Sequence, residues 1–396
     1  MISQRQLFLQ HVGQTSESPV MLEIEKAEGI YLYDIYGKKY IDLISGVSVS
    51  NVGHCHPKVT QAVKNQVDKY MHLMVYGEYI QSPQVQFAQL LAKQIPESLS
   101  STYFVNSGSE ANEAALKLAK RYTGRTQIIA CKNAYHGSTH GALSLMSQPL
   151  YKEAFLPLLP EVEFIEFNND ADLNFISEKT ACVIVEPVQA EAGIILPENN
   201  YLQKLRKKCT ETNTLLIFDE VQTGFGRLGS LFGFIKYNVI PDIFTIAKGM
   251  GGGMPIGAVV SSKKIMDAFK TNPVLGHITT FGGHPVSAAA ALASLNILID
   301  EHIIAQVDRK GELFRKLLTH KLIKKIHGTG LLLSVEISDF DMVLKFNKIL
   351  IEKGAISDWF LFCNNRFRIA PPLIITESQI ADACKIIISA LDEISK

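Results

Sequence analysis

The stretches LLIFDEVQTGFGRLG (215–229) and IPDIFTIAKGMGGGMPIG (240–257) carry the strongest structural signal in the chain. The first opens with four apolar residues that stop at Asp219, and the second contains the apolar run Ile243–Ala247, which stops at Lys248. Such runs are typical of buried strands in a parallel sheet. Because open α/β sheets bind ligands at the carboxyl ends of their strands, we expect Asp219 and Lys248 to lie at one edge of a sheet.

The same pattern repeats along most of the chain. From about residue 57 to residue 299, helical segments such as Glu110–Arg121 and Asn200–Thr212 separate short apolar runs. The runs that we predict as strands are 101–105, 127–130, 182–185, 215–218 and 243–247. Strands that alternate with helices indicate βα units, so the sequence predicts an α/β fold with a large, mostly parallel sheet flanked by helices.

The two ends of the chain follow other patterns. Residues 30–43 predict two short strands around a turn. After Asp300 we expect a helical region to about residue 324, a strand pair turning at 328–330, an extended run to Pro371-Pro372, and a last helix behind the capping box Thr376-x-x-Gln379. The predicted buried face of that helix is Ile380, Cys384, Ile387, Leu391 and Ile394. We predict an N-terminal segment (1–56) that joins the small domain, a large domain (57–300) and a small C-terminal α/β domain (301–396).

Composition narrows the class of protein. Among 396 residues, 39 Lys and Arg balance 39 Asp and Glu, which gives no electrostatic reason to expect nucleic acid or an anionic membrane as a partner. The longest uncharged apolar stretch, 286–299, is too short for a membrane span, and the first residues lack a signal-peptide pattern. Six scattered cysteines favour free thiols in a reducing compartment, so we expect a cytoplasmic protein. His54-Cys55-His56 lacks a second ligand pair, so we expect no metal site.

Asp219 and Lys248 together indicate a particular cofactor. Either one alone is more often a turn carboxylate or a surface charge. A buried carboxylate, however, needs a partner such as a protonated ring nitrogen, and a partly buried lysine becomes a nucleophile toward an aldehyde. Pyridoxal 5'-phosphate carries both groups. We interpret Lys248 as the residue that forms the aldimine and shuttles the proton, Asp219 as the partner of the ring nitrogen, and Gln222 as a contact of a ring oxygen.

Two further segments fit the same cofactor. Ser107, Gly108 and Ser109 open a long amphipathic helix, whose first N–H groups bind anions such as phosphate, although Ser107-x-x-Glu110 also fits a simple capping box. Tyr135 follows a predicted strand in a short loop with His136 and Gly137. Its ring is placed either to stack on a flat cofactor or to fill a half-buried loop.

Carboxylates and arginines near strand ends indicate a substrate site. Glu186 and Glu191 frame EPVQAEAG (186–193) directly after a predicted strand. Arg368 lies in RFRIAPPL (366–373) and suits a bidentate grip on a carboxylate. Arg366 would share its strand face, so the sequence does not rank the two arginines.

Taken together, the motifs resemble the class III pyridoxal-phosphate aminotransferases of fold type I, and among them the acetylornithine and ornithine aminotransferase group. The motifs cover nearly the whole chain: GIYLYDIYGKKYIDL (29–43), GHCHP (53–57), NSGSEANEAALKLAK (106–120), EPVQAEAG, FDEVQTGFGR (218–227), AKGMGGGMPIGA (247–258), TTFGGHP (279–285) and RIAPPL (368–373). FDEVQTGFGR is the most specific, together with the AKG-glycine segment in which Lys248 stands 29 positions after Asp219. The resemblance implies a seven-stranded large domain and a smaller C-terminal domain.

The resemblance also implies a role for each site residue. The implied cofactor-binding residues are Ser107, Gly108, Ser109, Tyr135 (stacked on the ring), His136, Glu186, Asp219 (at the pyridinium), Val221, Gln222 (at the ring hydroxyl) and Lys248. Thr280 would reach the phosphate of a neighbouring subunit, which implies a homodimer whose interface includes the segment 1–56. Arg368 would grip the carboxylate of glutamate or 2-oxoglutarate, with Glu191 as a gate that neutralises Arg368 when an ω-amine binds.

The amine donor is left open by Ser138. The acetylornithine group usually has at this position an Arg that holds the donor α-carboxylate. Its absence favours donors whose far end is not an α-amino acid, or a replacement Arg elsewhere, among acetylornithine, ornithine, lysine, 4-aminobutyrate and polyamines. Smaller departures are His284, where the family has GGNP, and Ala190, where it has QGE.

The implied reaction is a two-stage amino transfer to 2-oxoglutarate. Its rivals are an aminomutase or racemase on the same fold and a non-catalytic oligomer. Arg368 with Glu191 favours transamination, because only a two-substrate enzyme needs a carboxylate clamp that can be switched.

Overall fold

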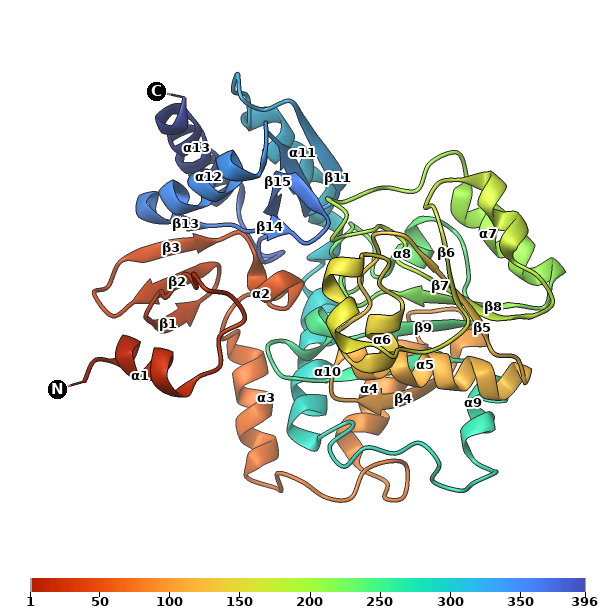
Figure 1. The fold of residues 1–396 in the computed structure, drawn as a ribbon. Coiled ribbons are helices and arrows are strands. Elements are labelled where there is room, and N and C mark those ends of the chain that lie inside the picture. Colours follow the sequence, from red (N-terminus) through yellow and green to blue (C-terminus); the bar gives the residue numbers. More distant parts are fainter. Residues whose placement is uncertain (1, 396) are drawn as a thin grey trace.

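The computed structural model describes residues 2–395 and is built around a sheet of seven strands (Figure 1). In spatial order these are β4 (Ser101–Val105), β10 (Gly257–Ser261), β9 (Ile243–Ile246), β8 (Leu215–Asp219), β7 (Thr180–Val185), β5 (Gln127–Cys131) and β6 (Val162–Ile165). All run in one direction except β10, which pairs antiparallel with β4 and β9. The predicted fold class is therefore confirmed.

Helices cover both faces of this sheet because its central strands are apolar on both sides. In β8, Leu216 belongs to one core cluster and Ile217 to another, as expected for side chains that alternate along a strand. The cluster around Ile217 includes α5 (Gly108–Thr123). The cluster around Leu216 includes α7 (Tyr201–Glu211) and α10 (Pro285–Asp300). The polar residues that end these strands thus lie at the sheet edge, outside two dry cores.

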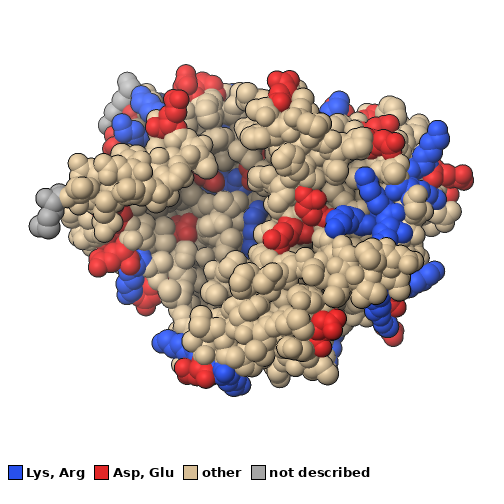
Figure 2. Space-filling model, turned by 60° about the horizontal axis from the view of Figure 1, so that its bottom comes forward, with Lys and Arg blue, Asp and Glu red and all other residues tan. Residues whose placement is uncertain are grey.

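The apolar stretch 286–299 forms the interior of α10, which packs against α3 (Pro57–Val67) and α4 (Ser82–Ala92). No single helix within residues 2–395 has the length and apolar composition to cross a membrane. Only α10 taken together with Ile304–Leu317 reaches that threshold, and the two are bent by 53°. Basic and acidic side chains both occur across the face drawn in Figure 2.

The N-terminal and C-terminal parts of the chain share a four-stranded sheet. Its order is β1 (Ile24–Glu28), β2 (Tyr31–Asp34), β3 (Lys39–Asp42) and β13 (Ala355–Ile356). A second four-stranded sheet consists of β11 (Lys325–Thr329), β12 (Leu332–Glu336), β15 (Cys363–Ile369) and β14 (Trp359–Phe360). The predicted hairpins at 30–43 and 328–330 are the pairs β2–β3 and β11–β12. The division of the chain at residues 56 and 300 stays a prediction.

The C-terminal helices are α11 (Val307–Leu317), α12 (Phe340–Lys353) and α13 (Glu377–Ile394). The capping box at Thr376 and Gln379 is formed as predicted, and the five predicted apolar positions of α13 are all buried. The remaining α-helices are short: α1 (Gln4–His11), α2 (Ser45–Ser48), α6 (His140–Ser144), α8 (Gly233–Lys236) and α9 (Lys263–Met266). The sequence did not predict β6 or β10. Strand β10 directly follows the glycine-rich segment. Glycine allows many backbone conformations, so the residue types there do not indicate that the chain turns back into the sheet.

Candidate active site

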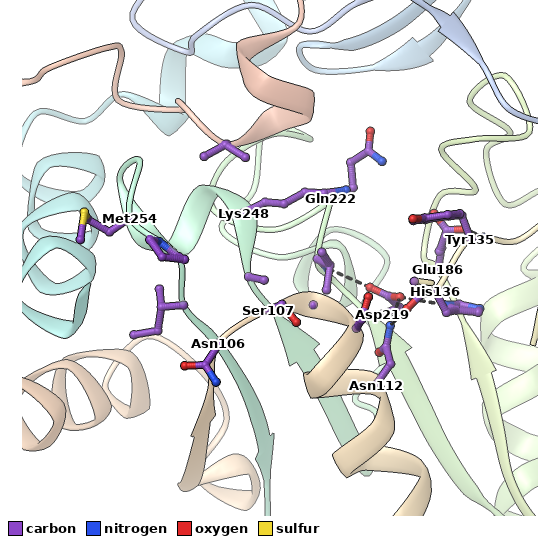
Figure 3. Close-up of a pocket in the computed structure, with 18 of the residues that line it drawn as sticks. Asn106, Ser107, Asn112, Tyr135, His136, Glu186, Asp219, Gln222, Lys248 and Met254 are labelled. Carbon is purple, nitrogen blue, oxygen red and sulfur yellow. Dashed lines mark hydrogen bonds and ion pairs between the residues drawn. The ribbon is translucent and has the colours of Figure 1, made fainter. Parts of the chain in front are cut away.

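A cavity of about 420 Å³ lies at the carboxyl edge of the large sheet (Figure 3). Its lining includes ten of the predicted cofactor-binding positions: Ser107, Gly108, Ser109, Tyr135, His136, Glu186, Asp219, Val221, Gln222 and Lys248. They come from the ends of β4, β5, β7, β8 and β9 and the loops that follow. The structure thus brings residues up to 141 positions apart in the sequence into one site, because parallel strands end at the same edge.

Asp219 is the last residue of β8 and is held as a hydrogen-bond acceptor. Its Oδ2 accepts from the Nδ2 of Asn112 at 2.8 Å and from the Nδ1 of His136 at 2.7 Å, and its Oδ1 accepts from the N–H of Val221 at 3.0 Å. Dashed lines in Figure 3 mark such contacts. Only 4% of Asp219 is exposed, so these donors replace water around a buried carboxylate. Oδ1 keeps acceptor capacity for a protonated ring nitrogen.

Lys248 follows β9 and has a backbone φ of 45°, which is unusual for a non-glycine residue. Burial lowers the pKa of its amine, and the charges of Glu191 and Asp219 oppose this only in part. A larger neutral fraction makes the amine a better nucleophile toward an aldehyde.

The start of α5 forms a tight cradle for an anion. Ser107 Oγ accepts from the N–H of Glu110 at 3.1 Å, so Ser107 is the N-cap. The predicted capping box is only half formed, because Glu110 Oε2 accepts from the N–H of Asn106 instead. A Cβ on Gly108 would lie 2.8 Å from Val221 Cγ1. A residue larger than glycine at position 108 would thus collide with Val221. The first turn of α5, which lines the cavity, offers its free N–H groups to an anion.

Tyr135 and Glu186 lie on the side of the cavity beside Asp219 (Figure 3). Glu186 accepts from the N–H of Tyr135 at 3.2 Å and from that of Ala190 at 3.1 Å. Burial raises the pKa of Glu186 to about 7. This carboxyl thus fixes the loop that carries Tyr135, and it is only partly ionised near neutral pH.

Arg368 lies in a second cavity of about 540 Å³, which shares Tyr135 and Lys248 with the first. Its guanidinium donates to Glu191 at 2.8 Å, to Gln222 at 2.6 Å and to Asp358 at 2.8 Å. Only 1% of Arg368 is exposed. The arginine is thus fully paired inside the protein, which a buried guanidinium requires.

The two carboxylates on Arg368 differ in their pKa. Burial alone would raise the pKa of Glu191, but the charge and hydrogen bond of Arg368 outweigh burial and hold that pKa below its usual value. At Asp358, burial raises the pKa in spite of the opposing charge of Arg368. Glu191 is therefore the more firmly ionised partner.

Three residues considered in the sequence lie away from these two cavities. Thr280 is exposed, and Ser138 lines a different cavity. Arg366 donates to the carbonyl of Gly193 at 2.7 Å and lies 3.5 Å from Glu336. The structure thus separates the arginines that the sequence did not rank, and Arg368 is the one beside Lys248.

Asn112 and Asp358 belong to the site but were not predicted from the sequence. Asn112 stands four residues after Gly108 on α5, a spacing that puts both on one helix face, so a signal was available. Its Oδ1 accepts from the hydroxyl of Thr245 at 2.8 Å, which orients the amide toward Asp219. Asp358 gave no signal, because its contact with Arg368 depends on how β14 and β15 lie together.

The residues present fit pyridoxal 5'-phosphate. A carboxylate for the ring nitrogen, an amine for the aldehyde and a helix N-terminus for the phosphate line one cavity. A Cβ on Gly137 would lie 2.1 Å from Ser109 Oγ, so the phosphate end is closely packed. This combination defines an enzyme of the pyridoxal-phosphate class.

Comparison with known proteins identifies the family. A family model described as aminotransferase class-III matches residues 12–391. The acetylornithine aminotransferase of Methanopyrus kandleri is 38% identical over 384 residues, which cover 96% of each chain. That of Methanocaldococcus jannaschii is 40% identical over 391 residues, 95% of this chain and 93% of its own. The chain therefore belongs to the class III aminotransferase family.

A solved structure agrees with this assignment. The ornithine aminotransferase from Toxoplasma gondii superposes with a TM-score of 0.91 at 31% identity, covering 100% of this chain and 96% of its own. That structure has partial occupancy of pyridoxal phosphate at its active site. The protein is an aminotransferase of a family that uses pyridoxal 5'-phosphate.

Proposed function

We propose that the protein transfers an amino group from an ω-amine or amino-acid donor to 2-oxoglutarate in two half-reactions with ping-pong kinetics. The observation that carries this proposal is the pair Arg368 and Glu191 beside Lys248. A buried arginine that is paired with a removable carboxylate suits an enzyme that must accept an amine in one step and a dicarboxylate in the next.

The roles proposed for the site residues follow from their positions. Bound pyridoxal phosphate supplies a ring that withdraws electrons from the donor carbon. Asp219, fixed by Asn112 and His136, holds the ring nitrogen protonated. Lys248, with its lowered pKa, takes the proton from the donor carbon in the first half-reaction. In the second half-reaction it gives a proton to the acceptor carbon that receives the amino group.

Glu191 serves as the gate in this proposal. Its lowered pKa keeps it ionised, so it neutralises Arg368 while an amine donor without a carboxylate occupies the site. A carboxylate of 2-oxoglutarate then replaces it on the guanidinium. Gln222 and Asp358 hold Arg368 in place during the exchange.

We further propose a homodimer in which Thr280 reaches the phosphate bound by the other subunit. Exposed apolar side chains near Thr280 support this proposal: Met71, Tyr79, Ile80, Val274, Leu275, Ile278 and Phe281. The His72 and Phe281 rings lie 4.8 Å apart and join the two segments that carry them. Apolar surface of this kind favours association.

The direct test is Lys248→Ala, with Lys207→Ala as the control because the Lys207 side chain is 78% exposed. The wild type and the control should show the visible absorbance of lysine-bound cofactor, discharged by borohydride, and should transfer amino groups from a panel of ω-amines to 2-oxoglutarate. The Lys248 variant should lose both properties. Near-native transfer by that variant would reject the assignment, and product formation without any need for 2-oxoglutarate would favour a mutase or racemase.

A further inference from the structure

A third cavity, of about 840 Å³, continues from the site beyond Tyr135. It shares Tyr135, Trp359 and Leu361 with the cavity that contains Lys248 and Arg368. Ser138 lines it, and the Ser138 Oγ lies 3.1 Å from the Tyr135 hydroxyl. The two cavities therefore adjoin, and the remaining atoms of a molecule whose amine reacts at Lys248 have space close by in this third cavity, which we name the tail cavity.

The tail cavity has no charged lining. Its eleven lining residues, all described in the structure, include no Lys, Arg, Asp or Glu. One part of the wall is apolar, with Met146, Phe155 and Trp359, and another part offers the hydroxyl of Ser138 and the imidazole of His140. Six of the eleven lining residues are exposed, among them Ser138, Phe155 and Trp359, so a carboxylate or ammonium placed there would keep part of its water but would meet no side chain of opposite formal charge. An alkyl or aryl group would gain from burial.

The neighbouring cavity disfavours a second carboxylate on the donor as well. There, Arg368 already carries Glu191 and Asp358, two carboxylates on one guanidinium. Among the residues that line these two cavities, an anionic donor tail thus meets the Arg368 guanidinium only by displacing Glu191.

We propose that the tail cavity binds the part of the amine donor that lies beyond the reacting carbon, and that this part is uncharged and at least partly apolar. The inference rests on the proposed amino transfer and adds the chemical class of the donor. Ser138 is its specificity-determining residue, because a guanidinium at that position would supply the missing charge.

Three donors of equal length test the proposal: hexylamine, 6-aminohexanoate and 1,6-diaminohexane. Each has six carbons and reacts through the same CH₂–NH₂ group, so they differ in the end group of the tail and its charge. The rate of each is divided by that of the glutamate half-reaction in the same preparation, followed by the cofactor spectrum of the holoenzyme. Hexylamine should exceed both charged donors by about fourfold or more in kcat/KM, the gain expected from burying one more methyl group. An equal or faster reaction of either charged donor would overturn the proposal.

A Ser138→Arg variant should shift the preference of the cavity from an uncharged donor tail toward a tail that carries a carboxylate. The ratio of kcat/KM between the carboxylate-bearing donor, 6-aminohexanoate, and hexylamine should rise by about tenfold or more in this variant. Thr139→Arg is the matched control, because Thr139 is exposed and does not line the cavity. An unchanged ratio in Ser138→Arg would place the donor tail elsewhere.

Binding can also be read without turnover, because Trp359 is the only tryptophan of the chain. Titration of the holoenzyme with 1-hexanol, which has no amine, should give a saturable change in tryptophan fluorescence, and hexanoate should give none over the same range. If glutamate fails to react, the proposed function is refuted. The fluorescence titration still tests whether the tail cavity binds an uncharged, apolar molecule. A response to hexanoate that matches or exceeds that to hexanol, or no response to hexanol, would overturn the proposal.

Discussion

Replacing Arg368 with lysine keeps a positive charge beside Lys248 but removes the planar fork of the guanidinium. That group now donates in three directions, to Glu191, Gln222 and Asp358, at 2.6–2.8 Å. A lysine ammonium is a point charge on a flexible stem and does not reproduce such a geometry. We therefore expect Arg368→Lys to bind 2-oxoglutarate weakly.

The magnitude follows from the hydrogen bonds lost. In the proposed second half-reaction, a substrate carboxylate replaces Glu191 and meets two parallel N–H groups of Arg368, whereas lysine offers it one. A charge-assisted hydrogen bond contributes about 1.5–3 kcal/mol. The KM for 2-oxoglutarate should therefore rise by about 10- to 150-fold.

The assay separates the two half-reactions by single-turnover measurements on the holoenzyme. The half-reaction with glutamate or 2-oxoglutarate should be impaired far more than the half-reaction with an ω-amine. Arg366→Lys is the matched control, because Arg366 lies on the same strand but bonds the Gly193 carbonyl outside the site. A KM for 2-oxoglutarate that changes equally in both variants would refute the role of Arg368.

Two further predictions concern buried groups. Burial raises the pKa of Glu220 from 4.5 to about 7, so the folded protein retains a proton that the unfolded chain releases, and this residue lowers stability as pH rises from 4.5 to about 7. Glu220→Gln removes that loss. The difference in free energy of unfolding by urea between the variant and the wild type should therefore shift in favour of the variant by up to about 3 kcal/mol between pH 4.5 and pH 8. Parallel pH profiles for the two proteins would contradict this. Gly137→Ala places a Cβ 2.1 Å from Ser109 Oγ at a backbone φ of 126° and should weaken binding of pyridoxal phosphate, measured by equilibrium dialysis of folded apoprotein. Unchanged affinity in that variant would show that the cradle is not tightly packed.

The sequence predicted the large sheet well because the signal is local. Strand β4 matches its predicted bounds, and β8 and β9 differ from theirs by one residue at the carboxyl end. An apolar run that stops at a polar residue predicts both a strand and the place where that strand leaves the sheet. Asp219 and Lys248 could therefore be assigned to one site from the sequence.

Features that depend on contacts between distant elements were out of reach. Arg366 and Arg368 point to the same face of β15, and only the pairing of that strand decides which of them lies beside Lys248. Asp358 reaches Arg368 across a short, irregular strand pair. The capping box at Ser107 looked complete, yet Glu110 bonds the N–H of Asn106, an outcome fixed by local geometry rather than by residue type.

The charge balance around Arg368 bears on the proposed exchange between an amine donor and a dicarboxylate. With both carboxylates ionised, the cluster has one negative charge in excess, which would repel a dicarboxylate. Burial raises the pKa of Asp358 and Arg368 lowers that of Glu191, so a proton is taken up at Asp358 before Glu191 as pH falls. In the proposed exchange, Glu191 leaves with its charge while Asp358 stays on Nε and keeps the guanidinium aimed at the cavity. A single carboxylate on Arg368 would have to neutralise and orient the arginine at once, and its departure would undo both.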